Sequence, residues 1–403
     1  MSATKPQTLD DVCEFIVDCL HKTAPTQEDG YPSIRTPNVG RGRLLLEGVN
    51  CVSENTYREW TRRAVPRAND LILAREAPAG NVAIIKNGQT VCLGQRTVHL
   101  RPDPTKVDPD FLCYFLLAPP QQGALLAGET GATAGHVNMR DIRRLPLHRL
   151  PDLAVQRKMG AIIAAYDDLI ENNRRRIQLL EQSARLLYKE WFVQFRFPGH
   201  EHVKIKNGVP EGWERVVVPD IIEINPRETV AKESDIRYVP MSSLSETGMT
   251  INMEDTEVRQ TATSVKFRNS DTLLARITPC LENGKTGFVN FLSEGEVACG
   301  STEFIVLRGR RVSPYFTYCL ARTYDFRENA IKSMIGSSGR QRVQPSCFSE
   351  FVIGLPSMPI LQQFDETTSK CFNQIRCLIG QNRNLSKARD LLLPRLMNGE
   401  IAV

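Results

Sequence analysis

Two long stretches of this 403-residue chain carry apolar residues at alternating spacings of four and three. In the first stretch these positions are Met159, Ile163, Tyr166, Ile170, Asn173, Ile177, Leu180, Ala184, Leu187 and Trp191. In the second stretch, shifted by 205 residues, they are Phe364, Thr368, Cys371, Ile375, Leu378, Asn382, Leu385, Arg389 and Leu392. This spacing is typical of a coiled coil and predicts two helices of about 35–40 residues each.

The ends of both predicted helices carry recognisable signals. Asp152 and Ser357 stand directly before the two apolar runs, and both residue types are favoured as N-caps. We expect the first helix to end near Phe195 and the second near Pro394, because proline cannot continue a helix interior. Each helix has one apolar stripe, which is most simply buried if the two helices pack against each other in an antiparallel pair.

Each apolar stripe is interrupted by one asparagine. Asn173 falls at a d position and Asn382 at an a position, and these positions lie side by side in an antiparallel pair. We therefore predict that the two asparagines meet near the middle of the pair and fix its alignment. The alternative is that each asparagine bonds water or its own helix.

The segments that precede the helices are globular and related to each other. Residues 70–78 recur as residues 271–279, with five of nine positions identical. Short β-branched stretches alternate with turn signals and short helical stretches, which predicts an α+β fold in each globule. The predicted organisation is a globule at 1–151, a long helix at 152–197, a second globule at 198–356 and a second long helix with a tail at 357–403.

Composition places the chain among ordinary soluble proteins. Hydrophobic residues make up 41% and charged residues 24%, and no apolar run approaches the roughly 18–20 residues of a membrane span. The start of the chain lacks the apolar core of a signal peptide, so we expect a cytoplasmic protein without a membrane partner. The eleven cysteines include no Cys-x-x-Cys pair, which favours free thiols over a zinc site.

Catalytic motifs are missing from the sequence. Residues 283–286 (NGKT) resemble the end of a phosphate-binding loop, but Pro279 stands where that loop requires glycine. The sequence contains neither a dinucleotide-binding glycine pattern nor a His-Glu-x-x-His metal motif. We therefore expect no catalytic residues, no metal site and no cofactor in this chain.

Basic and amide side chains gather in loop-like stretches of both globules. Arginine, lysine, asparagine and glutamine can read base edges in the major groove, and glycine-rich loops let the backbone follow a duplex. The net charge of +5 is mild, so an anionic partner must be bound by local clusters rather than by a global field. Each cluster can also be an ordinary solvated patch. The candidates for DNA contact are Arg41, Arg43, Arg96, His136, Asn138, Lys285, Arg340, Gln341 and Arg342.

Arg75 and Arg276 occupy matched positions of the repeat, each after an apolar strand-like run. Two interpretations stay open for them. Each arginine either pairs with a nearby acid, such as Asp70 or Asp271, or contacts DNA.

The chain resembles the DNA-specificity subunit of type I restriction–modification systems. The resemblance covers the whole chain and is strongest in the helices. The segments that carry it are residues 170–180 (IENNRRRIQLL), 184–192 (ARLLYKEWF), 388–401 (ARDLLLPRLMNGEI), 210–213 (PEGW) and 131–138 (GATAGHVN).

The resemblance implies two target-recognition domains separated by a pair of long antiparallel helices, with an internal pseudo-twofold repeat. Each domain would read one half of a bipartite site in double-stranded DNA, and the helices would set the spacing. The implied partners are two methyltransferase subunits, which use S-adenosylmethionine, and a restriction and translocation subunit, which uses ATP and Mg²⁺. The exposed helix faces and residues 391–397 would dock the methyltransferase. The alternatives are a self-contained DNA-modifying enzyme and a coiled-coil scaffold that binds only proteins.

Overall fold

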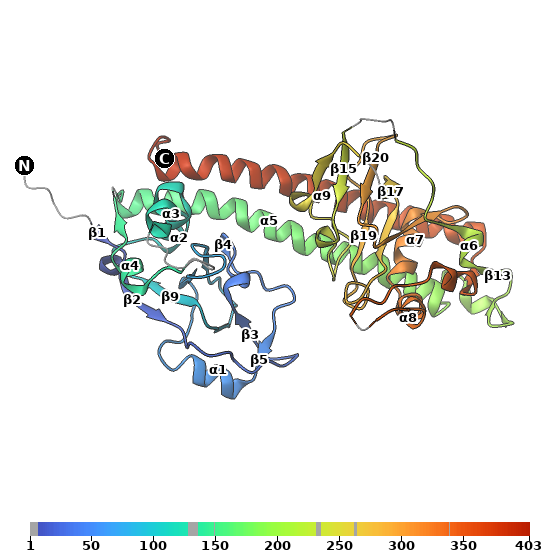
Figure 1. The fold of residues 1–403 in the computed structure, drawn as a ribbon, viewed down its shortest axis with the longest axis horizontal. Helices are drawn as coiled ribbons and strands as arrows, with labels where there is room; N and C mark the ends of the chain where they lie inside the picture. The colour runs from blue at the N-terminus through green and yellow to red at the C-terminus, as the bar shows by residue number, and fades with distance from the viewer. Residues whose placement is uncertain (1–6, 128–135, 149, 231–234, 262–263, 338) are drawn as a thin grey trace, which may run out of the picture. The chain divides into compact units, whose positions relative to one another are not determined.

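The structure is a computed structural model in which the chain forms two compact units (Figure 1). Unit 1 comprises residues 1–172 and 381–403, and unit 2 comprises residues 173–380. Each unit therefore contains one globule together with a part of both long helices. The residues described are 7–127, 136–148, 150–230, 235–261, 264–337 and 339–403.

Unit 1 is built on a five-stranded sheet and a smaller three-stranded sheet. The first has the order β2 (Cys13–Asp18), β9 (Thr97–Pro102), β6 (Leu71–Ala74), β7 (Val82–Ile84) and β4 (Gly42–Arg43). The second has the order β5 (Cys51–Val52), β3 (Tyr31–Ile34) and β8 (Cys92–Leu93), while β1 (Gln7–Thr8) pairs with β10 (Pro146–Leu147). The short helices are α1 (Glu54–Trp60), α2 (Pro109–Leu117), α3 (Pro119–Leu126) and α4 (Met139–Arg143).

Unit 2 repeats this plan. Its central sheet has the order β14 (Ile222–Ile224), β21 (Phe304–Gly309), β18 (Thr272–Ala275) and β19 (Thr286–Phe288). A second sheet contains β16 (Glu257–Arg259), β15 (Ile236–Val239), β20 (Val297–Gly300) and β17 (Val265–Arg268). The remaining pairs are β13 (Glu214–Val217) with β22 (Val352–Leu355) and β11 (Ile205–Lys206) with β12 (Val209–Pro210). The short helices are α6 (Val218–Ile221), α7 (Pro314–Ala321) and α8 (Tyr324–Lys332).

The repeat seen in the sequence is a repeat of topology. The strand order β2-β9-β6-β7 in unit 1 corresponds to β14-β21-β18-β19 in unit 2. In the smaller sheets, β3 and β15 each pair with one antiparallel and one parallel neighbour. The predicted α+β fold of both globules is confirmed.

Two long helices follow the globules, as the heptad pattern predicts. Helix α5 (Leu153–Tyr188) has 36 residues and continues as a π-helical turn, and α9 (Met358–Met397) has 40 residues. Every predicted a and d position of both helices is buried or half-buried. Asp152 caps α5, since its Oδ1 accepts a hydrogen bond from the Val155 amide at 2.9 Å.

The second helix does not end at Pro394. It continues to Met397, with the proline inside its last turn. A proline in a helix interior costs about 3 kcal/mol, but Leu396 and Met397 are buried in the core of unit 1. Each such side chain gains about 1.5–3 kcal/mol on burial, so the packing outweighs the lost hydrogen bond. The prediction of an end near Pro394 is therefore wrong.

Within unit 2, the two helices run in opposite directions. Tyr188, at the end of α5, lies 6.1 Å from Phe364, near the start of α9, measured between ring centroids. Seven residues earlier on α5, Glu181 accepts a hydrogen bond from the Tyr318 hydroxyl at 2.6 Å. The Tyr318 ring lies 5.8 Å from the ring of Phe372 on α9. Moving back along α5 therefore corresponds to moving forward along α9.

In unit 1 an acidic residue of α5 joins the globule to α9. Asp167 is buried and accepts hydrogen bonds from the Tyr114 hydroxyl at 2.8 Å and from Arg389 Nη1 at 2.5 Å. Asn173 belongs to unit 2 and Asn382 to unit 1. Their pairing stays a prediction, as do the four domain boundaries.

A buried aspartate stands directly before the central strand of each unit. The Asp70 carboxylate accepts hydrogen bonds from Arg101 Nε and Nη2, both at 2.8 Å, and from His99 Nε2 at 2.6 Å. The Asp271 carboxylate accepts two from Arg308, at 2.7 and 2.6 Å. The repeat thus preserves a bidentate arginine–carboxylate pair at the start of the central strand of each unit.

The interpretation that Arg75 pairs with an acid is confirmed, but the acid is Asp18, at 2.6 Å, and not Asp70. Arg276 donates to the carbonyl of Val343, and its suggested pairing with Asp271 is wrong. Each arginine follows its aspartate by five residues along an extended strand, a separation of about 16 Å. Arg101, by contrast, lies on the neighbouring strand β9, next to the position that pairs with β6. Cross-strand neighbours are therefore much closer than residues five apart in one strand.

We expect Asp70→Asn to lower the free energy of unfolding by about 3–5 kcal/mol at pH 7, because it leaves the Arg101 guanidinium without its buried counter-charge. Burial acts to raise the pKa of Asp70, but hydrogen bonds from Arg101 and His99 bring it below its ordinary value. The stabilisation is therefore present above the ordinary pKa of about 3.9 and is lost as pH falls through the lowered value. Urea titrations across this pH range would measure it. The exposed Asp29→Asn is the control, and equal losses in both variants would contradict the prediction.

Candidate nucleic-acid interface

Three segments meet at the end of the central strand in each unit, and we call this meeting point the loop junction. In unit 1 the Arg75 amide donates to the carbonyl of Arg96 at 3.0 Å, and the Arg75 carbonyl accepts from the Val137 amide at 3.0 Å. In unit 2 the Arg276 amide donates to the Glu303 carbonyl at 2.9 Å, and its carbonyl accepts from Val343 at 2.8 Å. The same main-chain bonds therefore hold both junctions.

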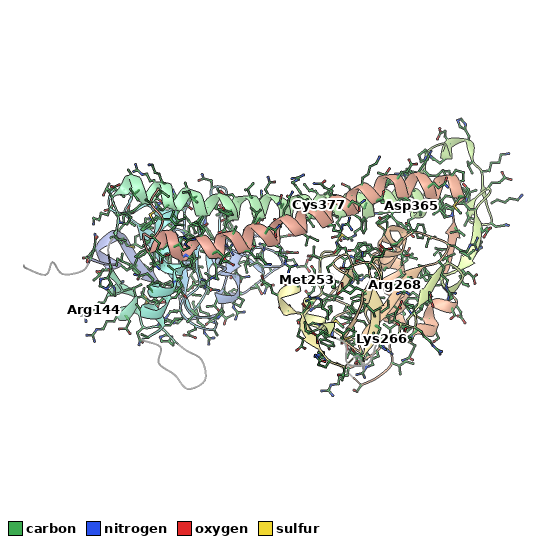
Figure 2. The ribbon with its side chains drawn as sticks, turned by 90° about the horizontal axis from the view of Figure 1, so that it is seen from above. Arg144, Met253, Lys266, Arg268, Asp365 and Cys377 are labelled. Atoms are coloured by element: carbon green, nitrogen blue, oxygen red, sulfur yellow. The ribbon has the colours of Figure 1, made fainter. Side chains whose placement is uncertain are left out.

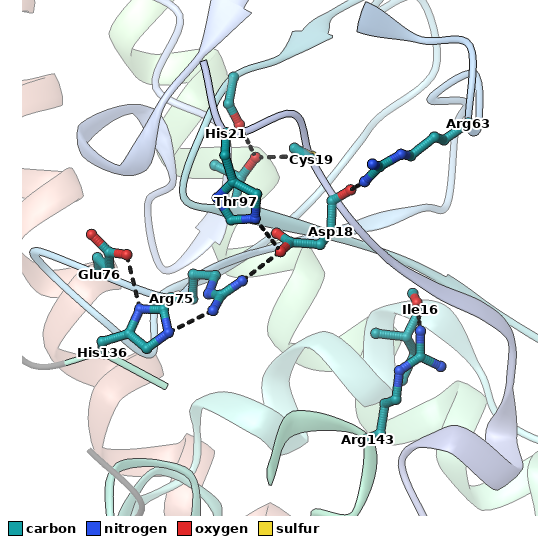
Figure 3. A network of polar contacts seen from close by, with 11 residues as sticks. Ile16, Asp18, Cys19, His21, Arg63, Arg75, Glu76, Thr97, His136 and Arg143 are labelled. Carbon is teal, nitrogen blue, oxygen red and sulfur yellow. Dashed lines mark hydrogen bonds and ion pairs between the residues drawn. The ribbon is translucent and has the colours of Figure 1, made fainter. Parts of the chain in front are cut away.

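The junction of unit 1 is organised around one carboxylate (Figure 3). Glu76 accepts a hydrogen bond from His136 Nδ1 at 2.8 Å, which Figure 3 shows. It also forms an ion pair with Arg96 Nε at 2.9 Å. Arg96 has a positive φ of 69°, a conformation rare for a residue with a β-carbon. The fold thus brings together three of the predicted site residues, Arg75, Arg96 and His136.

Arg75 lies inside this network rather than on the surface, with 6% of its area exposed. Its Nη1 pairs with Asp18 at 2.6 Å and its Nη2 lies 2.5 Å from His136 Nε2 (Figure 3). Because a guanidinium only donates, His136 accepts at Nε2 and donates to Glu76 at Nδ1, which corresponds to the neutral imidazole. Arg75 therefore orients His136 from behind.

The junction of unit 2 uses a carboxylate from a different position. Glu303 accepts hydrogen bonds from Arg342 Nε at 2.9 and 3.0 Å and from Arg342 Nη2 at 2.8 Å. This pairing raises the pKa of the exposed Arg342 guanidinium above its ordinary value. Arg276 Nη2 donates to the carbonyl of Val343 at 3.1 Å, so this arginine supports the loop that carries Arg342.

The remaining residues of the two candidate loops differ in exposure. Arg340 is exposed, and its side chain has no bonding partner in the described part of the chain. Gln341 is half-buried, and its main chain forms two hydrogen bonds with Thr278. Its amide donates to the Thr278 hydroxyl and its carbonyl accepts from the Thr278 amide, both at 3.1 Å. Asn138 is half-buried and precedes α4 without capping it. Residues 131–135 and Ser338, which belong to the same sequence motifs, lie outside the described residues.

Three other predicted contacts are bound to the protein itself. Arg41 donates to the carbonyl of Leu117 at 3.1 Å, and Arg43 pairs with Glu171 of α5 at 3.2 Å. Lys285 donates to the carbonyl of Met241 at 3.3 Å. Their contact with DNA stays a prediction, and each would have to exchange an internal partner for a phosphate or a base.

Sequence reasoning missed the two carboxylates of the junctions. Glu76 and Glu303 are 20 and 39 residues from Arg96 and Arg342, respectively, so no local spacing identifies them. It also missed Lys266 and Arg268, which alternate with the buried Phe267 on β17. These two side chains lie on the part of unit 2 away from Asp365 of α9 (Figure 2). Their i, i+2 spacing is typical of one face of a strand.

Within residues 7–127, 136–148, 150–230, 235–261, 264–337 and 339–403, no group of three His, Cys, Asp or Glu side chains is placed to hold a metal ion. All eleven cysteines are free thiols. In the same ranges, no helix combines the length and apolarity required to cross a membrane.

Known proteins resemble this chain over most of its length. A family described as the type I restriction modification DNA specificity domain matches residues 1–182. The type I restriction enzyme MjaIX specificity subunit of Methanocaldococcus jannaschii is 26% identical over 371 residues, which cover 89% of this chain and 83% of that protein. The EcoEI specificity subunit of Escherichia coli is 32% identical over 155 residues, covering 37% of this chain and 26% of that protein.

A solved structure has the same fold. The crystal structure of a type I restriction–modification S subunit from M. genitalium superposes with a TM-score of 0.52 at 14% sequence identity, covering 97% of this chain and 95% of that one. The two-domain arrangement with long helices is thus shared, and the sequence relatives carry one consistent name. Residues 1–182 belong to the family of type I restriction modification DNA specificity domains, and the whole chain is similar in sequence and fold to specificity subunits of type I restriction–modification systems.

Proposed function

We propose that each unit of this specificity subunit reads one half of a bipartite target in double-stranded DNA and that α5 and α9 set the distance between the halves. The observation that carries this proposal is the loop junction, which occurs twice with the same main-chain bonds and with different side chains. Two domains that share a main-chain arrangement but differ in side chains can recognise two half-sites of different sequence. Half-sites about one helical turn apart are separated by roughly 34 Å, a distance that helices of this length span.

Base reading is assigned to the loops that end at the junctions. Arg340 and Arg342 in unit 2 and Asn138 in unit 1 have the donors and acceptors needed for base edges. Both ring nitrogens of His136 are bound inside the protein, so His136 would have to release a partner to read a base. The basic side chains at Arg41, Arg43, Arg96 and Lys285 suit phosphates, which position a protein on the duplex without specifying sequence. Arg75 and Arg276 support these loops from behind.

Chemistry is assigned to partner subunits. The relatives are named specificity subunits, and this supports a non-catalytic role. Two methyltransferase subunits with S-adenosylmethionine and one restriction and translocation subunit with ATP and Mg²⁺ would complete the complex. A methyltransferase must take its adenine out of the helical stack, so the specificity subunit needs only to place it.

Exposed leucines on α5 are the best docking surface for a methyltransferase. Leu179 and Leu186 lie seven residues apart, on one face of the helix, and are 61% and 59% exposed. Leu169 and, on α9, Leu391 are also exposed. Within residues 391–397, Leu393, Leu396 and Met397 are buried in the core of unit 1, so Leu391 is the exposed leucine of that segment.

The alternative of a self-contained DNA-modifying enzyme can be tested directly. Purified chain is incubated with duplex DNA and S-adenosylmethionine, alone or with the methyltransferase subunit. Methylation only in the second mixture supports the proposal, whereas methylation by the chain alone would overturn it.

Arg342→Ala in the assembled complex should weaken binding to the target by about 1–3 kcal/mol and relax the base preference at one position. The reason is the loss of a two-donor contact with a base. Competition between target and randomised duplex measures both quantities. Arg311→Ala, which breaks an exposed ion pair with Glu214 in the same unit, is the matched control and should change binding by less than about 0.5 kcal/mol. Unchanged affinity and preference in Arg342→Ala would exclude this residue from base reading.

The double variant Leu179→Asp, Leu186→Asp should lose the methyltransferase subunit while keeping the fold, because two charges replace apolar side chains that are already exposed. Size-exclusion chromatography with light scattering measures the complex, and circular dichroism measures the fold. The double variant Gln178→Asp, Gln182→Asp adds the same charge on other exposed positions of α5 and should still assemble. Full assembly of the leucine variant would refute this docking surface.

A further inference from the structure

Each loop junction contains one carboxylate that binds the basic side chains assigned to DNA. In unit 1 it is Glu76, from the end of β6, and in unit 2 it is Glu303, from the loop before β21. These positions are not equivalent in the repeat, since residue 303 corresponds to Arg96 and residue 277, which corresponds to Glu76, is isoleucine. The two carboxylates are nevertheless equally accessible, with 21% and 22% of their side-chain areas exposed.

The pairing in unit 2 leaves one edge of the arginine available. A guanidinium has five N–H donors in a fixed plane. Glu303 takes Nε–H and one N–H of Nη2 of Arg342, so two N–H groups on Nη1 and one on Nη2 remain. Donors on the two terminal nitrogens are what a contact with O6 and N7 of guanine requires. The carboxylate therefore holds the arginine by one edge and leaves the reading edge open.

In unit 1 the carboxylate fixes the histidine ring and the loop that carries it. Glu76 accepts from His136 Nδ1, and Arg75 donates to His136 Nε2. With both ring nitrogens bound, the imidazole cannot rotate freely, and the adjacent Asn138 loop is anchored at the same point. An orientation fixed before binding spares the loss of rotamer freedom on binding.

A carboxylate at a DNA-facing surface opposes binding in one respect, since it repels phosphates. Its presence at both junctions therefore favours a role in orientation over a role in affinity. A purely structural ion pair is the competing explanation, and it predicts an effect on stability without an effect on base preference.

We infer that Glu303 and Glu76 are positioning residues that set base preference by holding Arg342 in unit 2 and, through His136, the loop that carries Asn138 in unit 1. This inference rests on the proposed function. Glu303 acts on the half-site read by unit 2 and Glu76 on the half-site read by unit 1, so the two can be tested independently in one protein.

The test uses the chain assembled with its methyltransferase subunit and a library of randomised duplex DNA, with bound sequences read after selection. Glu303→Gln keeps the size of the side chain but replaces one acceptor by an amide that faces the guanidinium. We expect discrimination at one base pair of one half-site to fall about 10-fold, within the 5- to 150-fold that one two-donor base contact provides. Glu76→Gln should alter only the other half-site.

The control is Glu228→Gln, which removes the carboxylate that pairs with Arg308 at 2.6 Å in the same unit. It should lower the unfolding midpoint and leave the selected motif unchanged. If Glu303→Gln behaves in the same way while Arg342→Ala relaxes the motif, the positioning role is overturned and the proposed function stands. If the wild-type complex selects no motif, or Arg342→Ala leaves it intact, the base-reading role assigned to this loop fails instead.

Discussion

The burial of two amphipathic stripes is the constraint on which the rest of the structure depends. A helix of 36 residues with one apolar face is not stable in water by propensity alone, because most helical stability comes from tertiary packing. Each unit meets this need by including parts of both helices in its hydrophobic core. In unit 2, Ile177, Ala184 and Tyr188 of α5 belong to the same cluster as residues of α7 and α9. The globules are therefore incomplete without the helices that follow them.

Polar contacts add alignment to this packing. Asp167 and Glu181 are buried acids on α5, and each accepts a hydrogen bond from a tyrosine of its own globule, Tyr114 of α2 and Tyr318 of α7. Glu181 also accepts from the main-chain amide of Met249 at 2.8 Å. A buried carboxylate is costly without partners, so these bonds define where each globule is seated on the helix. Both acceptors come from α5, although the repeat alone would assign them to different helices.

Periodic features of the fold could be predicted from the sequence, but pairings between distant segments could not. The heptads fixed which residues of α5 and α9 are buried, and the matched Asp70 and Asp271 revealed the repeat. The partners of these aspartates lie on neighbouring strands, about thirty residues away or more, where spacing carries no information. The same holds for Glu76 and Glu303. At Pro394 a local rule was overridden, since burial of the last turn exceeds the cost of the proline.

The loop junctions separate the frame of the protein from its chemistry. At Arg75 and Arg276, the bonds that join the three segments are made by main-chain atoms, which every amino acid except proline supplies. A change of side chain at positions 96 and 303, or at 136 and 342, leaves those bonds in place. Substitutions at these positions therefore keep the main-chain frame of the junction. Each junction can therefore carry different side chains while it keeps its main-chain hydrogen bonds, and the side chains of one unit can change independently of those of the other.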